Sequence, residues 1–170
     1  LIYGMRPYGL TRTTDLTLAE AENFVTAYFV RFPSVKAYIE NTKQQARQEG
    51  FVETLLGRRR FFPGLKEGTN YVLRSRLERE AINSPIQGTA ADIMKLAMLR
   101  VAAALPQAGL KGRLLLQVHD ELVLEVPDNE VDPTAKLVSQ ELGAAYTLKV
   151  PLATDVRSGQ NWGEMQEIKV

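Results

Sequence analysis

Between residues 21 and 32, aromatic and aliphatic side chains recur every three or four positions, which predicts a helix with one buried face. The preceding Thr17-Leu-Ala-Glu20 has the form of a capping box, in which the outer side chains bond each other's backbone N–H groups. Pro33 should end this helix, and Ser34 should cap a second one that stops at Gly50. These helices should form a compact αα unit.

Residues 51–62 alternate as two short strands would, and Gly57 between them predicts the turn of a β-hairpin. Its second strand carries Arg58, Arg59 and Arg60. Neighbouring strand residues face opposite sides, so these arginines cannot all point inward. One or two should face solvent or a phosphate group, which a guanidinium binds with two hydrogen bonds.

Residues 71–105 are predicted to be mainly helical. At 100° per residue, four polar side chains fall within roughly 80° of one another and could follow a duplex. This polar stripe consists of Arg76, Arg79, Asn83 and Gln87.

Pro85 should interrupt this helical region, because proline cannot sit undisturbed in a helix interior. Ser84, Pro85 and Gln87 together have the form of a capping box that starts a second helix. A kink at this point could still leave the stripe on one side. The second helix should end at Pro106 and Gly109.

Two apolar runs, residues 114–118 and 122–126, have the length and β-branched content of buried strands. His119, Asp120 and Glu121 lie between them, at the tip of a predicted hairpin. Adjacent carboxylates repel each other, which favours a positive partner, most simply a metal ion. The alternative is a solvated turn, since acids are ordinary loop residues.

The chain should end with a covering helix over residues 130–146 and a last strand over residues 148–156. A carboxylate-tipped hairpin with helices around it predicts an α+β fold, a small antiparallel sheet covered by helices.

Composition narrows the class of protein. The 170 residues include no cysteine and no 18-residue apolar run, and no signal peptide is evident. An intracellular (cytoplasmic) protein without a membrane contact is therefore expected.

Charge is distributed unevenly along the chain. Residues 58–79 hold seven Lys or Arg, Lys66 among them, against two Asp or Glu; residues 120–170 hold four Lys or Arg against ten Asp or Glu. One segment should attract polyanions and the other cations, although a charge run is often only a solvated face.

The string Gln117-Val-His-Asp-Glu121 resembles motif C of the family A DNA polymerases, the bacterial DNA polymerase I family. The string Asn83-Ser-Pro-Ile-Gln-Gly-Thr-Ala-Ala-Asp92 resembles the palm signature of the same family. The hairpin arginines, the Tyr-Gly-Met that begins at Tyr3, and Gly159-Gln-Asn-Trp162 have similar counterparts. The resemblance implies a helical remainder of the fingers subdomain in residues 1–68 and a palm subdomain in residues 69–170.

The resemblance also implies a reaction, template-directed DNA synthesis from dNTPs on a primer-template with two Mg²⁺ ions. It makes Asp120 a metal ligand and Glu121 a neighbouring catalytic acid. His119 would contact DNA near the primer terminus, and Tyr3 would stack on the nascent base pair or gate the template; the alternatives are a packed histidine and a buried tyrosine. The DNA-binding residues would be Arg58, Arg59, Arg60, Arg76, Arg79, Asn83, Gln87 and His119.

The family's other palm aspartate and its triphosphate-binding Lys and Arg have no counterpart string in this chain. The resemblance therefore implies the C-terminal part of a polymerase, bacterial or phage and nucleoid-associated, that is inactive without the upstream segment. Two alternatives stay open: a non-catalytic, duplex-binding remnant of a polymerase, and an unrelated Mg²⁺-dependent phosphohydrolase.

Overall fold

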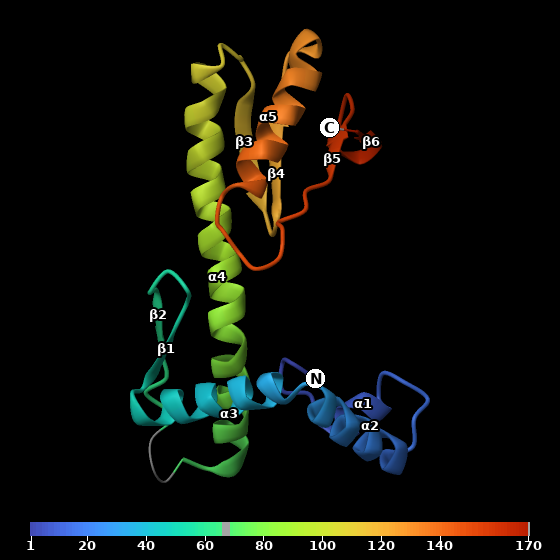
Figure 1. Ribbon diagram of the computed structural model, residues 1–170, viewed down its shortest axis with the longest axis vertical. Helices are drawn as coiled ribbons and strands as arrows, with labels where there is room; N and C mark the ends of the chain where they lie inside the picture. The colour runs from blue at the N-terminus through green and yellow to red at the C-terminus, as the bar shows by residue number, and fades with distance from the viewer. Residues whose placement is uncertain (66–68, 170) are drawn as a thin grey trace. The chain divides into compact units, whose positions relative to one another are not determined.

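The computed structural model describes residues 1–65 and 69–169, so Lys66 lies outside the described residues (Figure 1). The chain divides into two compact units, Leu1–Thr89 and Ala90–Val170. The division falls inside a helix, and the predicted boundary between fingers and palm after residue 68 stays a prediction. No helix within the described ranges is both long and apolar enough to cross a membrane.

The described elements confirm the α+β class, with five α-helices and three two-stranded antiparallel sheets. In chain order they are α1 (Pro7–Thr11), α2 (Leu18–Arg31), α3 (Pro33–Gln48), β1 (Phe51–Glu53), β2 (Arg59–Phe61), α4 (Tyr71–Gln107), β3 (Arg113–Val118), β4 (Glu121–Glu125), η1 (Asp128–Glu130), α5 (Val131–Gly143), β5 (Val156–Ser158), η2 (Trp162–Glu164) and β6 (Gln166–Ile168).

The predicted capping box of α2 is confirmed. The backbone N–H of Glu20 donates to the Thr17 hydroxyl at 3.3 Å, and the Thr17 N–H donates to the Glu20 carboxylate at 2.8 Å. Hydrogen bonds from the Thr17 hydroxyl and backbone lower the pKa of Glu20. The prediction that Ser34 caps α3 is wrong: the helix starts at Pro33, whose fixed φ suits a first helical residue, and Phe32 precedes it without a side-chain cap.

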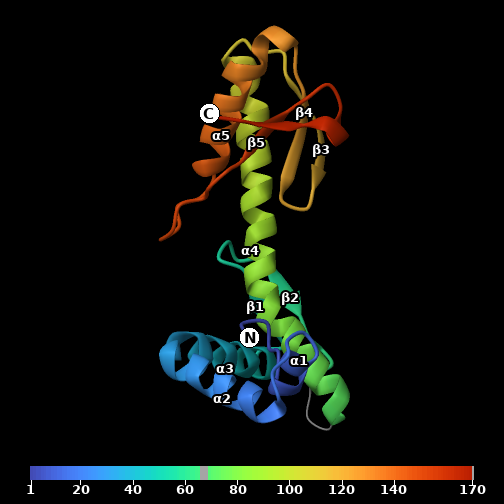
Figure 2. The same cartoon turned by 90° about the vertical axis from the view of Figure 1, so that its right-hand side faces the viewer.

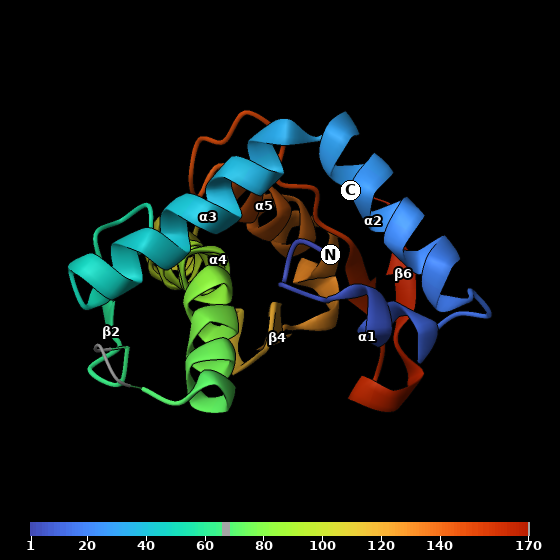
Figure 3. The same cartoon turned by 90° about the horizontal axis from the view of Figure 1, so that it is seen from below.

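The first unit has its core where the β1–β2 hairpin meets α3 and α4. Val52 of β1 is fully buried, in register with Arg60 of β2. It packs in a cluster with Ala46, Phe62, Leu65 and Ala81. Figure 3 shows α3 passing across the first turns of α4, where Tyr38 of α3 donates its hydroxyl to the Ile82 carbonyl at 2.8 Å. Burial raises the pKa of Tyr38.

Helix α4 continues through Pro85 without a break, so the prediction of a second helix capped by Ser84 is wrong. The Ser84 hydroxyl instead donates back to the Glu80 carbonyl at 2.6 Å. Pro85 has no N–H for the Ala81 carbonyl, but hydroxyl donors bond the carbonyls on either side of it, at Glu80 and Ile82. Pro106 also lies inside α4, and Gly109 follows it with a left-handed φ of +71°.

In the second unit, the β3–β4 hairpin and α5 lie beside the C-terminal turns of α4 (Figure 2). Val101, Leu105 and Val138 form the core there. The strands are not buried on both faces as predicted, since Leu115 and Leu116 are 52% and 48% exposed. A register shift between Leu114 and Leu116 marks a bulge in β3, and only one face of the hairpin packs on the helices.

The predicted helix over residues 130–146 is confirmed as α5, but the predicted last strand over residues 148–156 is wrong. Residues 148–155 have no strand pairing: the chain bends at residues 149 and 150, and Pro151 removes one of the N–H donors that a ladder needs. The Thr154 hydroxyl lies 2.6 Å from the Ser139 hydroxyl of α5. A hairpin of β5 and β6, which the sequence pattern did not suggest, follows.

The turn of the β1–β2 hairpin touches α4 at Gly88. A Cβ at that position would lie 2.6 Å from the Thr54 Cγ2, closer than real Cβ atoms come. One residue further on, the Thr89 hydroxyl accepts the Leu55 N–H at 3.0 Å. Glycine therefore lets two backbones approach each other, which accounts for an otherwise unfavourable residue inside a helix.

We expect Gly88→Ala to lower the free energy of unfolding by up to about 2 kcal/mol, because overpacking costs about 1–3 kcal/mol and helix propensity returns about 1. Thr54→Ser removes the clashing methyl and keeps the hydroxyl that accepts from the Leu56 and Arg58 N–H groups. In that background, Gly88→Ala should become neutral or stabilising. Urea unfolding of the four variants measures both effects, and a stabilising Gly88→Ala in the native background would contradict the close approach.

Candidate nucleic-acid interface and catalytic carboxylate

The first unit gathers the predicted DNA-binding residues on the β1–β2 hairpin and the first half of α4. Arg58 is turned toward the protein's own backbone: its Nη2 donates to the Gly88 carbonyl at 2.8 Å. This bond lies beside the one between Leu55 and Thr89, so Arg58 helps to fix the hairpin on α4. Its predicted contact with DNA stays a prediction, and the observed contact gives it a structural role.

Arg59 lies on the other face of the hairpin. Its Nε donates to the Glu53 carboxylate at 2.7 Å, across the strand pair. Its guanidinium also lies 4.4 Å from the centre of the Phe51 ring, within the range of a cation–π contact. The side chain is half exposed, so such a pair contributes about 0–1 kcal/mol to stability.

Arg60 and Arg76 converge on one carboxylate, that of Glu80. Arg60 Nη2 donates to it at 2.8 Å from β2, and Arg76 Nε donates at 3.1 Å from the preceding turn of α4. Arg60 Nη1 also donates to the Ser84 hydroxyl at 3.1 Å. Each guanidinium keeps further N–H donors, and the two side chains are 54% and 72% exposed. Two guanidiniums beside one carboxylate leave a net positive surface that is accessible to a phosphate.

Arg79, Asn83 and Gln87 follow one another at four-residue intervals of the unbroken helix α4, so they share one face. Arg79 and Gln87 are exposed, and Asn83 is half-buried. The Asn83 Oδ1 has no hydrogen-bond partner among residues 1–65 and 69–169. The polar stripe predicted from the sequence is therefore present on one helix.

The N-terminal segment reaches this stripe at Gly4. Gly4 has a left-handed φ of +78°, and a Cβ there would lie 3.1 Å from Arg79 Cγ and 3.5 Å from Ile82 Cδ1. Tyr3, beside it, is 53% exposed, so the alternative of a buried tyrosine is wrong.

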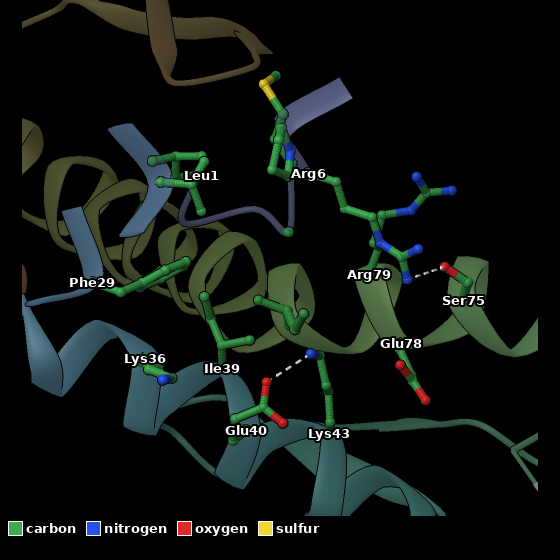
Figure 4. A pocket seen from close by; sticks show the side chains of 15 residues that line it. Leu1, Arg6, Phe29, Lys36, Ile39, Glu40, Lys43, Ser75, Glu78 and Arg79 are labelled. Carbon is green, nitrogen blue, oxygen red and sulfur yellow. Dashed lines mark hydrogen bonds and ion pairs between the residues drawn. The ribbon is translucent and has the colours of Figure 1, made fainter. Parts of the chain in front are cut away.

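A pocket of about 210 Å³ lies nearby. It is lined by the N-terminal segment, α2, α3 and α4 (Figure 4). Its charged residues are Arg6, Lys36, Glu40, Lys43, Glu78 and Arg79.

In the second unit, the β3–β4 hairpin turns through two residues, His119 and Asp120. The prediction placed Glu121 in the loop too, but Glu121 already belongs to β4 and pairs with Val118. His119 has a left-handed φ of +55°, unusual for a residue other than glycine. All three side chains at the tip are exposed, so Asp120 presents its carboxylate to solvent.

The sequence did not reveal the roles of three residues of these sites. Glu80 carried a signal, because it lies four residues after Arg76 on a predicted helix, the spacing of an ion pair. Tyr38 carried none, since its hydroxyl bonds a carbonyl 44 positions away. Gln117 donates its side-chain N–H to the His119 carbonyl, and a polar residue in an apolar strand was the only hint of it.

Comparison with known proteins identifies the class of protein to which this fold belongs. The family model for DNA polymerase family A matches residues 1–164, and the chain belongs to that family. It is 48% identical over 164 residues to the DNA polymerase I of Caldicellulosiruptor bescii, covering 96% of this chain and 19% of that protein. It is 46% identical over 162 residues to the DNA polymerase I of Geobacillus stearothermophilus, covering 95% and 18%.

Among solved structures, the chain resembles the POL domain of Pol1 from M. smegmatis in a complex with DNA primer-template and dNTP. The TM-score is 0.82 with 45% identity, over 89% of this chain and 26% of that one. The chain thus spans less than a fifth of the length of the two curated relatives and about a quarter of the solved domain.

A family A polymerase implies metal-dependent catalysis, and the tip residues fit one part of a metal site. Asp120 offers an exposed carboxylate, the hard oxygen ligand that Mg²⁺ prefers, and Glu121 adds a second one nearby. Within the described ranges, no three His, Cys, Asp or Glu side chains come close enough to hold an ion. Because Mg²⁺ retains several waters and binds substrate phosphates, one carboxylate can be the contribution of this chain.

The contact of Arg58 with the Gly88 carbonyl predicts a cost in stability for its loss. Arg58→Met, which keeps most of the side-chain length, should lower the free energy of unfolding by about 1 kcal/mol, because the hydrogen bond is lost. Arg76→Met is the matched control and should change it by less than about 0.5 kcal/mol, as expected for an exposed pair. Equal effects of the two substitutions in urea unfolding would contradict a structural role for Arg58.

Proposed function

We propose that this chain supplies the C-terminal part of a DNA-directed DNA polymerase, which transfers nucleotides from dNTPs to a primer 3′-hydroxyl under the direction of a template. The observation that carries the proposal is the exposed Asp120 at the tip of a two-residue loop in a chain of family A. The resemblance to a polymerase domain in complex with primer-template and dNTP supports it. The proposal includes a cytoplasmic location in a bacterium or phage-infected cell, beside the nucleoid.

Asp120 is the residue that would hold Mg²⁺, with Glu121 at the edge of the site. When bound, two Mg²⁺ ions lower the pKa of the primer 3′-hydroxyl and neutralise charge on the triphosphate. The short loop matters here, because it places the Asp120 carboxylate beyond the ends of both strands. His119 would lie against the primer end as a DNA contact.

Arg79, Asn83 and Gln87 are proposed to donate hydrogen bonds to minor-groove acceptors. Every correct base pair presents such acceptors at purine N3 and pyrimidine O2, so these donors can test base-pair shape without reading sequence. Asn83 suits this role because its side chain is half-buried, which restricts the conformations of its amide. The stripe follows one face of α4, which gives the donors a regular spacing.

Arg60 and Arg76 are proposed to bind backbone phosphates with the N–H donors that Glu80 does not take. Arg58 and Arg59 also have internal partners, the Gly88 carbonyl and the Glu53 carboxylate, and are proposed to offer their remaining N–H donors to the DNA backbone in the same way. Tyr3 is proposed as the stacking residue at the nascent base pair. In this scheme residues 1–68 belong to the fingers subdomain and residues 69–170 to the palm.

The alternative function is a non-catalytic module that grips duplex DNA. The same arginines and the same stripe would serve a binding module. Only the residues at the tip of the β3–β4 hairpin distinguish the polymerase function from the binding function. A binding module has no need for an exposed carboxylate in this loop, because an acid repels the phosphates of its ligand. The exposed Asp120 therefore favours the polymerase.

In the polymerase that contains this segment, Asp120→Ala should abolish nucleotide incorporation and leave the Kd for duplex DNA within about threefold. The reason is that loss of one oxygen ligand removes metal binding without touching a phosphate contact. Asp128→Ala is the matched control, an exposed aspartate of the same unit, and should keep full activity. Single-turnover primer extension provides the measurement, and near-normal turnover of Asp120→Ala would remove Asp120 from the metal site.

The 170 residues alone should bind duplex DNA weakly and should not extend a primer. Their described residues offer no cluster of three potential metal ligands, whereas two ions need several carboxylates. Binding should weaken as salt rises, with a slope of about −0.9 for each phosphate contacted. Adding the upstream part of the polymerase domain as a separate polypeptide should restore Mg²⁺-dependent extension.

Circular dichroism of the isolated chain first establishes that it is folded. Extension by this chain without the upstream part would show that the active site is complete within it and would overturn the shared-site proposal.

A further inference from the structure

The loop that carries Asp120 is fastened by a side chain that the proposed reaction does not use. Gln117, two residues before the loop, is exposed on β3, and its Nε2 donates to the carbonyl oxygen of His119 at 2.5 Å. The bond therefore joins the end of β3 to the first residue of the turn that follows it. It is the only side-chain hydrogen bond that the structure records for residues 118–121 among the described residues.

A hydrogen bond to the His119 carbonyl acts on the orientation of Asp120. The carbonyl of residue 119 and the N–H of residue 120 belong to one planar peptide group, so fixing the oxygen fixes the plane. The Asp120 Cα lies in that plane, so the plane and the φ of Asp120 together set the direction in which its Cα–Cβ bond leaves the chain. The amide of Gln117 is therefore coupled to the direction of the Asp120 carboxylate.

The backbone at His119 shows why such a fastening matters. Its φ of +55° lies in the left-handed region, which costs a residue with a Cβ about 1 kcal/mol or more relative to an ordinary conformation. The two-residue turn between the paired Val118 and Glu121 requires a positive φ. The bond to the His119 carbonyl adds a constraint on the orientation of the next peptide group, which carries the Asp120 N–H.

We propose that Gln117 is a positioning residue for Asp120: its side-chain amide holds the His119–Asp120 peptide in the orientation that presents the carboxylate to a divalent cation. The inference rests on the proposed role of Asp120 as a metal ligand. Residues that orient a ligand in this way typically change metal affinity 10–100-fold when they are replaced. Gln117 should act through affinity for the ion and leave duplex binding unchanged.

The competing explanation is that Gln117 only stabilises the turn. A local hydrogen bond of this kind contributes about 1 kcal/mol to folding, and its loss would lower the unfolding temperature. Such a loss would not alter metal affinity in the folded protein. The two explanations are therefore separated by metal binding measured well below the unfolding transition.

The test uses the polymerase that contains this segment, bound to primer-template. Gln117→Met keeps the side-chain length and removes the donor; Gln166→Met, at an exposed position of β6, is the matched control. Mn²⁺ binding is followed by the electron paramagnetic resonance signal of the free ion, and duplex Kd is measured separately. We expect the Mn²⁺ Kd to rise about tenfold in Gln117→Met and not in Gln166→Met, with duplex Kd within twofold.

The half-saturating Mg²⁺ concentration for primer extension should rise in parallel. Unchanged Mn²⁺ affinity in Gln117→Met would overturn the inference, whatever happens to the unfolding temperature. Should this variant fail to fold, Gln117→Leu replaces it, because leucine has no donor and adds no charge beside Asp120. Asp120→Ala in the same assay separates the two proposals: if it binds Mn²⁺ normally, the proposed function itself fails.

Discussion

The proline in the middle of α4 deprives the Ala81 carbonyl of its helical donor, and the first unit is built around the way this defect is accommodated. An interior proline costs a helix about 3 kcal/mol. The turn that loses the bond is held from two sides: Tyr38 of α3 donates to the Ile82 carbonyl, and Ser84, itself bonded by Arg60 of β2, donates to that of Glu80. Ala81 and Ile82 are fully buried in the same place. Tertiary contacts thus keep α4 helical where its own sequence favours a break.

The continuity of α4 has a direct consequence for the candidate interface. Had a new helix started at Ser84, Asn83 would have preceded its cap and Gln87 would have capped the backbone, with no fixed relation to Arg79. In one helix, the three side chains share a face and a regular spacing. Directly after Gln87, the last residue of the stripe, Gly88 and Thr89 receive the turn of the β1–β2 hairpin. The same stretch of helix therefore presents polar side chains and holds the hairpin that carries the arginines.

The three neighbouring arginines of that hairpin have different partners, although all three lie close to the candidate interface. Arg58 completes the contact with the Gly88 carbonyl, and Arg59 pairs across the strands with Glu53. Arg60 reaches α4 and shares Glu80 with Arg76. A guanidinium has five donors in a fixed fork, so one arginine can take an internal partner and still offer donors to a phosphate. All three arginines therefore have an internal partner, and they differ in which element that partner belongs to.

The sequence by itself determined the features that depend on near neighbours: the capping box of α2, the two hairpins with their turns near Gly57 and Asp120, the covering helix α5, the family, and the identity of the tip carboxylate. Local hydrogen bonds and hydrophobic period are sufficient for these. Only the tertiary structure decided that α4 passes through Pro85, that Leu115 and Leu116 are exposed, and that residues 148–155 do not pair as a strand. It also decided that Arg58 faces a carbonyl 30 positions away. Each of these depends on which partner a group meets after folding, and a proline, an arginine or an apolar strand face has no fixed partner in the sequence.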